Sequence, residues 1–239
     1  MYKRQDLVKR GYTTKQALGA LTTEVQASVA SGDKFSDVTT VSSQVLDAFG
    51  MRAKDTGTML KNTKRVVNEL AYSADATSTG FSDLGTAMSY VGTAAKANNI
   101  SLAETSSALG VLSNNGLESD KAGTALRATI NGLTNQINKI GTKNSIFTKL
   151  GIKKSEMLDA HGNLKGLSHD MGVLYQHIES HSKGGSDKNG FFKSIFGTSG
   201  MNGAMILAKS SKEVEDLTKR TEKAGKTGSY VAKLAAQNM

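Results

Sequence analysis

The chain of 239 residues carries 30 Lys and Arg against 21 Asp and Glu, which gives a net charge of +9, and it contains neither cysteine nor proline. Without cysteine, disulfides, thiolate metal ligands and a cysteine nucleophile are excluded. The basic residues are spread along the chain with no run of five, which is more typical of solvated helix faces than of a nucleic-acid or membrane patch.

The absence of proline, the strongest helix breaker, favours a chain made of helix after helix. Aromatic residues are scarce, so the core must rest on Leu, Ile, Val, Met and Ala. We therefore predict an all-α fold in which short amphipathic helices pack as helical hairpins. The longest apolar runs fall well short of the roughly 18–20 residues that a membrane-spanning helix needs, and no secretory signal opens the chain. A soluble internal protein is the expectation.

The first predicted segment, residues 1–34, begins with a frayed polar stretch through residue 12. Thr13 and Gln16 then have the spacing of a capping box, which starts a helix. Ser31-Gly32-Asp33 ends this helix. Its apolar residues fall on one side, at Leu18, Leu21, Val25 and Val29.

The second segment, residues 35–140, is the predicted helical core. Its first helix ends at Gly50 and carries an apolar stripe of Val38, Val41, Val45 and Phe49. Asp55 is predicted to cap the next helix, which continues past Leu70. A polar loop, residues 73–80, follows.

The span Phe81–Leu133 is the most regular part of this core. Its first helix has a stripe formed by Phe81, Leu84, Met88, Val91 and Ala95. Ser101 and Glu104 form a second capping box, in which the Glu104 carboxylate reaches back to the Ser101 N–H. That helix ends at Asn115-Gly116, and a third follows with Ala122, Leu126, Ile130, Leu133 and Ile137 on one face. Three helices this short need one another's apolar faces, so the span is a packing unit.

The third segment, residues 141–209, is a glycine-rich extension. A small β-hairpin is predicted near residues 156–166, turning at His161-Gly162-Asn163. A helix with Met171, Leu174 and Ile178 follows, and residues 182–190 are predicted to be a mobile loop. The fourth segment, residues 210–239, is a charged helix that opens with a capping box near Ser210–Glu213. It has no stop signal, and the chain is expected to be cut there.

The motifs that could carry catalytic chemistry are incomplete. Gly225-Lys226-Thr227 ends like a phosphate-binding loop, but Arg220 stands where that motif needs glycine, so a helix end is favoured. His169, His177 and His181 share roughly one helix side, but they lack the His-Glu-x-x-His order and are better explained as surface or capping residues. We predict no catalytic residue, no cofactor and no metal site, and hence no enzyme.

Residues 35–210 resemble the core of phage tail tape measure proteins of the TP901-type family. The string Ala122-Gly123-Thr-Ala-Leu-Arg127 carries the resemblance, together with Asn115-Gly116 just before it. Further similar pieces lie on both sides, at Val45–Gly50, Phe81–Leu84, Met88–Gly92, Ile100–Glu104, Leu109–Leu112, Leu150–Ile152, Leu158–Leu164 and Ile195–Gly197. Family members usually have proline after the third helix and are far longer than this chain, which is therefore expected to be a fragment without the rod.

The resemblance implies a structural role in the virion tail, assembled in the host bacterial cytoplasm. It implies as partners the tail tube protein, tail assembly chaperones and tail tip or baseplate proteins, with self-association through helices, membrane contact during DNA ejection and no specific nucleic acid. The residues that it singles out are Asn115, Gly116, Ala122, Gly123, Ala125, Leu126, Arg127, Phe196 and Gly197. Small residues among them would let helices approach closely, and Arg127 would pair with a carboxylate.

Two other classes of function remain open from the sequence. A cell-wall-degrading tail component is one, although no catalytic constellation supports it. A basic helical domain that binds nucleic acid or a membrane surface through the +9 charge is the other, and its binding would weaken steeply with salt.

Overall fold

The computed structural model describes residues 2–238 and confirms the all-α prediction. Its helices are α1 (Tyr2–Lys9), α2 (Thr14–Ser31), α3 (Phe35–Ala48), α4 (Thr56–Asp75), α5 (Phe81–Ala97), α6 (Leu102–Asn114), α7 (Ser119–Asn138), α8 (Ile146–Lys149), α9 (Lys154–Met157), α10 (Leu167–His181), α11 (Gly185–Lys209), α12 (Ser211–Thr227) and α13 (Tyr230–Gln237). Over these residues no helix combines the length and apolar content needed to cross a membrane.

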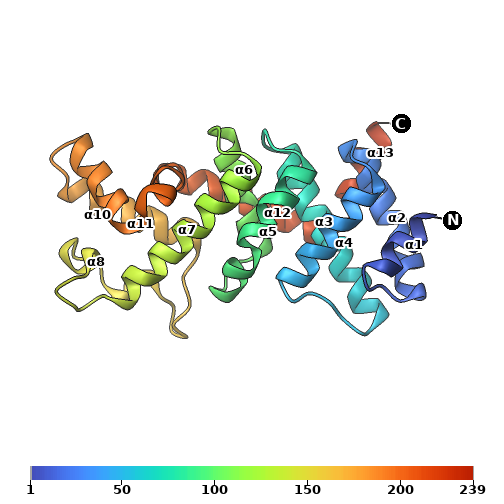
Figure 1. Cartoon of the computed structure of the whole chain (residues 1–239), viewed down its shortest axis with the longest axis horizontal. Helices are drawn as coiled ribbons and strands as arrows, with labels where there is room; N and C mark the ends of the chain where they lie inside the picture. The colour runs from blue at the N-terminus through green and yellow to red at the C-terminus, as the bar shows by residue number, and fades with distance from the viewer. Residues whose placement is uncertain (1, 239) are drawn as a thin grey trace.

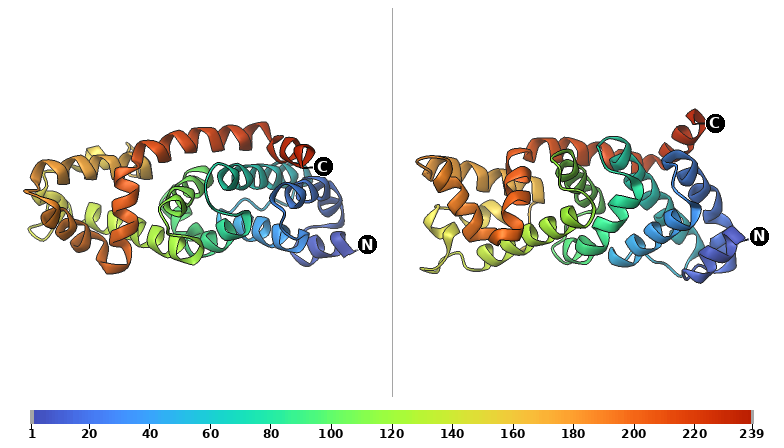
Figure 2. Two further views of the ribbon diagram at one scale, coloured as in Figure 1. Left: turned by 90° about the horizontal axis from the view of Figure 1, so that it is seen from above. Right: turned by 45° about the horizontal axis from the view of Figure 1, so that its top comes forward.

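The helices build an elongated body, with α1, α2 and α13 at one end and α8, α10 and α11 at the other (Figure 1). The chain advances along this body from α1 to α11. Helix α12 then returns along it, packed on α6 and α4, so that α13 lies against α2 (Figure 2). The C-terminal helix therefore closes the N-terminal end, where Asn238 Nδ2 donates to the carbonyl of Ala30.

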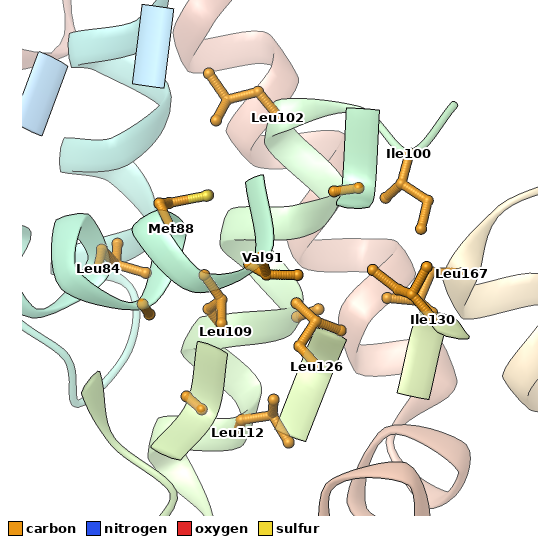
Figure 3. Packing of buried hydrophobic residues seen from close by; sticks show 14 of the residues in the cluster. Leu84, Met88, Val91, Ile100, Leu102, Leu109, Leu112, Leu126, Ile130 and Leu167 are labelled. Atoms are coloured by element: carbon orange, nitrogen blue, oxygen red, sulfur yellow. The ribbon is translucent and has the colours of Figure 1, made fainter. Parts of the chain in front are cut away.

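One cluster of buried apolar side chains runs through the body from Leu7 in α1 to Val231 in α13. Its centre lies among α5, α6 and α7, where Leu84, Leu109 and Leu126 are each at most 1% exposed (Figure 3). The predicted packing unit is thus the middle of the molecule. The division into segments 1–34, 35–140, 141–209 and 210–239 stays a prediction.

Several predicted helix starts are present. The Thr13 hydroxyl accepts from the Gln16 N–H, and the Gln16 side chain accepts from the Thr13 N–H, which completes the capping box of α2. Asp55 accepts from the Thr58 N–H at the start of α4, and this hydrogen bond lowers the pKa of the Asp55 carboxyl. The polar start is helical from Tyr2 and packs against α2 and α3 instead of fraying.

Thr13→Ala should lower the free energy of unfolding by about 1 kcal/mol, because it leaves an N-terminal amide of α2 without its acceptor. Thr22→Ala, on the exposed side of the same helix, is the matched control and should change stability by less than about 0.5 kcal/mol. Urea denaturation followed by circular dichroism measures both. Equal effects for the two variants would show that the cap does not stabilise α2.

The predicted apolar side of α2 is buried only in part, since Leu21 and Val25 are half-buried against the core. Leu18 and Val29 are 55% and 37% exposed, whereas the residues that face the core are Gln16, Ala17, Ala20, Glu24 and Ala27. Small side chains allow α2 to approach its neighbours closely. The polar ones have partners, since the Gln16 amide donates to the carbonyls of Ala53 and Lys54. In α2, small side-chain size and satisfied hydrogen bonds therefore decide which residues are buried more than hydrophobicity does.

The predicted mobile loop over residues 182–190 is wrong, because α11 begins at Gly185. Asp187 accepts from the Lys183 N–H, and Lys188 forms an ion pair with Glu179 of α10. Buried Phe192 then anchors the helix to the core. The connection between α10 and α11 is therefore short.

Two further predictions need correction. The hairpin near residues 156–166 is reduced to one antiparallel bridge between Leu158 and Leu164, since residues before it form α9. Asp159 stabilises this turn by accepting from the backbone N–H groups of His161 and Asn163. At the start of α12, the side chain of Ser210 makes no capping hydrogen bond.

Candidate functional site

The residues singled out by the sequence lie mainly where α7 packs between α5 and α11. Asn115 and Gly116 form the turn that leads from α6 into α7. The Asn115 side chain donates to the carbonyl of Val111, and Gly116 has φ +82°, in the left-handed region that favours glycine. This turn directs α7 back across α5.

Helices α5 and α7 touch at Gly123. A methyl group added to Gly123 would lie 2.3 Å from the carbonyl oxygen of Ala87, a backbone atom that cannot move aside by rotating. Ala122 and Leu126 flank this contact and are buried. The family string thus marks a point at which two backbones come together without room for a side chain.

The opposite side of α7 receives α11 through a second row of small residues. A Cβ added to Gly203 would lie 2.7 Å from the Cβ of Ala125, and one added to Gly200 would lie 2.9 Å from the Cβ of Ala128. Gly132 extends the row, because the ring of Phe196 occupies the space that its Cβ would take. We call the contacts of α7 with α5 and α11 the small-residue junction.

Gly197 bends α11 at this junction. Its φ of +69° and ψ of −179° interrupt the helix, a conformation that residues with a Cβ rarely adopt. The bend follows buried Phe196, whose ring stacks on Phe192 at 5.9 Å between centroids. The kink therefore places an aromatic pair on one side and Gly200 and Gly203 on the other.

Arg127 does not behave as predicted. Its side chain is exposed, and none of the ion pairs among residues 2–238 involves it. Ala122, Gly123, Ala125 and Leu126 face the neighbouring helices, so Arg127 falls on the outward side of α7. It contributes no electrostatic contact to the junction.

A second group of buried polar residues joins α4, α6 and α12, and no sequence pattern indicated it. The Ser73 hydroxyl lies 3.0 Å from that of Ser106 and 3.2 Å from that of Thr221, and Ser107 lies 3.3 Å from Thr221. All four are fully buried. Hydroxyls that satisfy one another let α12 pack closely on α4 and α6 without an unpaired donor.

Glu104 has a different role from the one predicted. Its carboxylate does not reach back to Ser101 but crosses to α10, where it accepts from the backbone N–H and hydroxyl of Ser168 at 3.0 and 3.2 Å. The N-cap residue of α10 is Gly166, which has no side chain to offer. Glu104 of α6 therefore caps α10 from outside, where a carboxylate also meets the positive end of the helix dipole.

Asp170 lies beside this cap and is fully buried. Burial raises the pKa of its carboxyl to about 8, and the nearby charge of Glu104 contributes to this rise. Neither carboxylate oxygen accepts a hydrogen bond of ordinary geometry from residues 2–238. Burial without a hydrogen-bond partner therefore favours the neutral form of Asp170 over the ionised one.

Two more carboxylates are buried, those of Glu24 on α2 and Glu69 on α4. The Ser42 hydroxyl donates to Glu24 at 2.6 Å, and burial raises the pKa of Glu24 to about 8. Glu69 pairs with Arg65 at 2.7 Å and lies beneath Gly225, where an added Cβ would come within 2.4 Å of its carboxylate. One sequence signal could have indicated the burial of Glu24, since it lies in register with the small residues Ala17, Ala20 and Ala27.

The histidines connect helices. His177 contacts the carbonyl of Leu150 through Nδ1 at 2.9 Å and Glu156 through Nε2 at 3.1 Å, and His169 contacts the carbonyl of Glu156. No group of three or more His, Asp or Glu side chains within residues 2–238 is arranged to hold a metal ion. Gly225-Lys226-Thr227 is the last turn of α12, as the favoured interpretation predicts.

The residues that the sequence singles out in this all-helical body serve mainly helix contacts and the turn between α6 and α7. The chain belongs to the family of phage-related minor tail proteins, which it matches over residues 4–197, and it is thus a structural component of a phage tail. It is also similar to the tape measure protein of Pneumococcus phage Dp-1, with 23% identity over 217 residues. That alignment covers 89% of this chain and 17% of the relative, so the chain spans less than a fifth of the relative's length. No solved structure matches the chain.

Proposed function

We propose that the chain is the helical globular part of a tape measure protein of the TP901 type, which sets tail length while tail tube subunits polymerise around it. The observation that carries this proposal is the alignment with a tape measure protein over 89% of the chain. In this role it would assemble in the host cytoplasm with tail tube, chaperone and tip or baseplate proteins. It would leave the tail ahead of DNA, with membrane contact during ejection.

We propose further that this part acts by packing and not by catalysis. The small-residue junction is occupied by contacts between helices, and the buried Glu104 is used to cap α10. Both observations favour a role in holding a shape.

The dimensions of the chain favour a ruler in another part of the protein. A helix rises 1.5 Å per residue, so 239 residues in one helix would reach only roughly 360 Å. The observed chain folds back on itself through α12 and is far shorter than that (Figure 2). The length-setting element would therefore lie outside these residues.

In-frame deletion of helical sequence downstream of these residues in the parent gene should shorten tails by about 1.5 Å for each residue removed. Tail lengths in electron micrographs of purified particles measure this. Replacement of the deleted stretch by an unrelated helical sequence of equal length is the control and should restore the length. Tails of unchanged length after deletion would contradict the tape measure role.

A further inference from the structure

A cavity of about 840 Å³ lies between α4 and the C-terminal turn of α12. Its cationic lining residues are Lys61, Lys64 and Arg65 from α4 and Lys226 from α12, against the single carboxylate of Glu222. The two helices are antiparallel here, because Gly225 packs on Glu69 whereas Gly228, which follows α12, packs on Lys64, which lies earlier on α4. Residues distant in sequence therefore line one basic cavity.

A second hollow adjoins this cavity at α4. This hollow of about 380 Å³ shares Asn62 and Arg65 with the first and adds Lys96 from the last turn of α5. We call the two together the α4 groove. Residues of α4, α5 and α12 line it, together with the segments that connect α3 to α4 and α5 to α6.

The charges of the α4 groove are largely unpaired. Arg65 pairs with Glu69, and Lys226 lies 3.3 Å from Glu222. Lys61, Lys64 and Lys96 take part in none of the ion pairs found within residues 2–238. Three ammonium groups held along one groove create a positive potential that is relieved by an anionic partner.

The lining favours carboxylates over nucleic acid. Sites for single-stranded nucleic acid add aromatic side chains on which bases stack. The larger hollow has no aromatic residue among its lining, and the one aromatic of the smaller hollow, Phe49, is only 5% exposed. We propose that the α4 groove binds an acidic polypeptide segment, whose Asp or Glu side chains pair with Lys61, Lys64 and Lys96. This inference does not depend on the tape measure role.

Fluorescence anisotropy with a fluorescein-labelled peptide of twelve glutamates tests the proposal on the full chain. In 50 mM salt the peptide should bind, and Lys61→Glu/Lys64→Glu should weaken binding at least tenfold. The control Lys121→Glu/Lys193→Glu changes the net charge equally at exposed positions on α7 and α11, and should change the Kd less than twofold. Circular dichroism of both variants is the check that they fold.

Two further probes distinguish an acidic polypeptide from a neutral peptide and from nucleic acid. A twelve-residue Gly/Ser peptide with the same label should not bind, and a labelled twelve-nucleotide oligothymidine should bind more weakly than the acidic peptide. An equal loss of affinity in the two double variants would overturn the proposal, because it would show that binding depends only on net charge. Tighter binding of the oligonucleotide, lost in Lys61→Glu/Lys64→Glu, would overturn it in favour of a nucleic-acid groove.

Discussion

Gly123→Ala should lower the free energy of unfolding by about 3 kcal/mol, near the upper end of the usual effect of overpacking. The added methyl group would meet the carbonyl oxygen of Ala87 at 2.3 Å, so α5 and α7 must separate. Separation would also disturb α11, which packs on the other side of α7. Urea denaturation followed by circular dichroism at 222 nm measures the loss.

Two other glycines provide graded controls for this prediction. Gly132→Ala should cost less, because the atom nearest to its Cβ belongs to the ring of Phe196, which can shift. Gly190→Ala lies on an exposed part of α11 with nothing within 4 Å, and it should be neutral or stabilising by up to about 1 kcal/mol. If Gly123→Ala cost no more than Gly132→Ala, the backbone contact would not be the constraint that we infer.

Asp170→Asn should stabilise the chain at neutral and alkaline pH, by on the order of 3–5 kcal/mol at pH 9. The folded protein keeps the Asp170 carboxyl protonated up to a pKa of about 8, whereas the unfolded chain releases that proton near its ordinary pKa of 3.8. The folded state therefore binds more protons between these values. The contribution of Asp170 to stability falls as pH rises from about 4 to 8 and is constant above that.

Measuring unfolding free energies from pH 4 to pH 9 separates the effect of Asp170 ionisation from any effect of the substitution that does not depend on pH. Asp170→Asn should match the unsubstituted chain at pH 4 and diverge from it progressively above that, since asparagine cannot ionise. Asp216→Asn, at an exposed position on α12, should follow the unsubstituted chain throughout. A constant difference at every pH would mean that Asp170 acts through shape and not through its charge.

The sequence predicts the centre of the molecule well because local signals and packing agree there. Leu84, Met88 and Val91 repeat at helical spacing, and Asn115-Gly116 supplies a turn that needs no tertiary support. These three side chains of α5 then lie in the core with Leu109 of α6 and Leu126 of α7 (Figure 3). The fold can be predicted where each helix carries its own capping residue, apolar stripe and terminating turn.

The candidate site could be predicted only in part, because close helix contact depends on partners that the sequence does not identify. The string Ala122–Arg127 indicates small residues, but only the structure shows that Gly123 meets Ala87 and that Ala125 meets Gly203. Glu104 has the spacing of a local cap, yet its carboxylate caps α10, 64 residues away. The backbone N–H groups at the start of α10 compete with the Ser101 N–H for the Glu104 carboxylate, and they bind it.

The return of α12 along the body has a mechanical consequence. Because α13 rests on α2, a pull applied to the two ends of the described chain acts at one end of the molecule only (Figure 1). Such a load would act first on α1 and α13, the helices at that end, and only after them on the α5–α7 centre. The body would yield gradually from its closed end instead of resisting tension along its length.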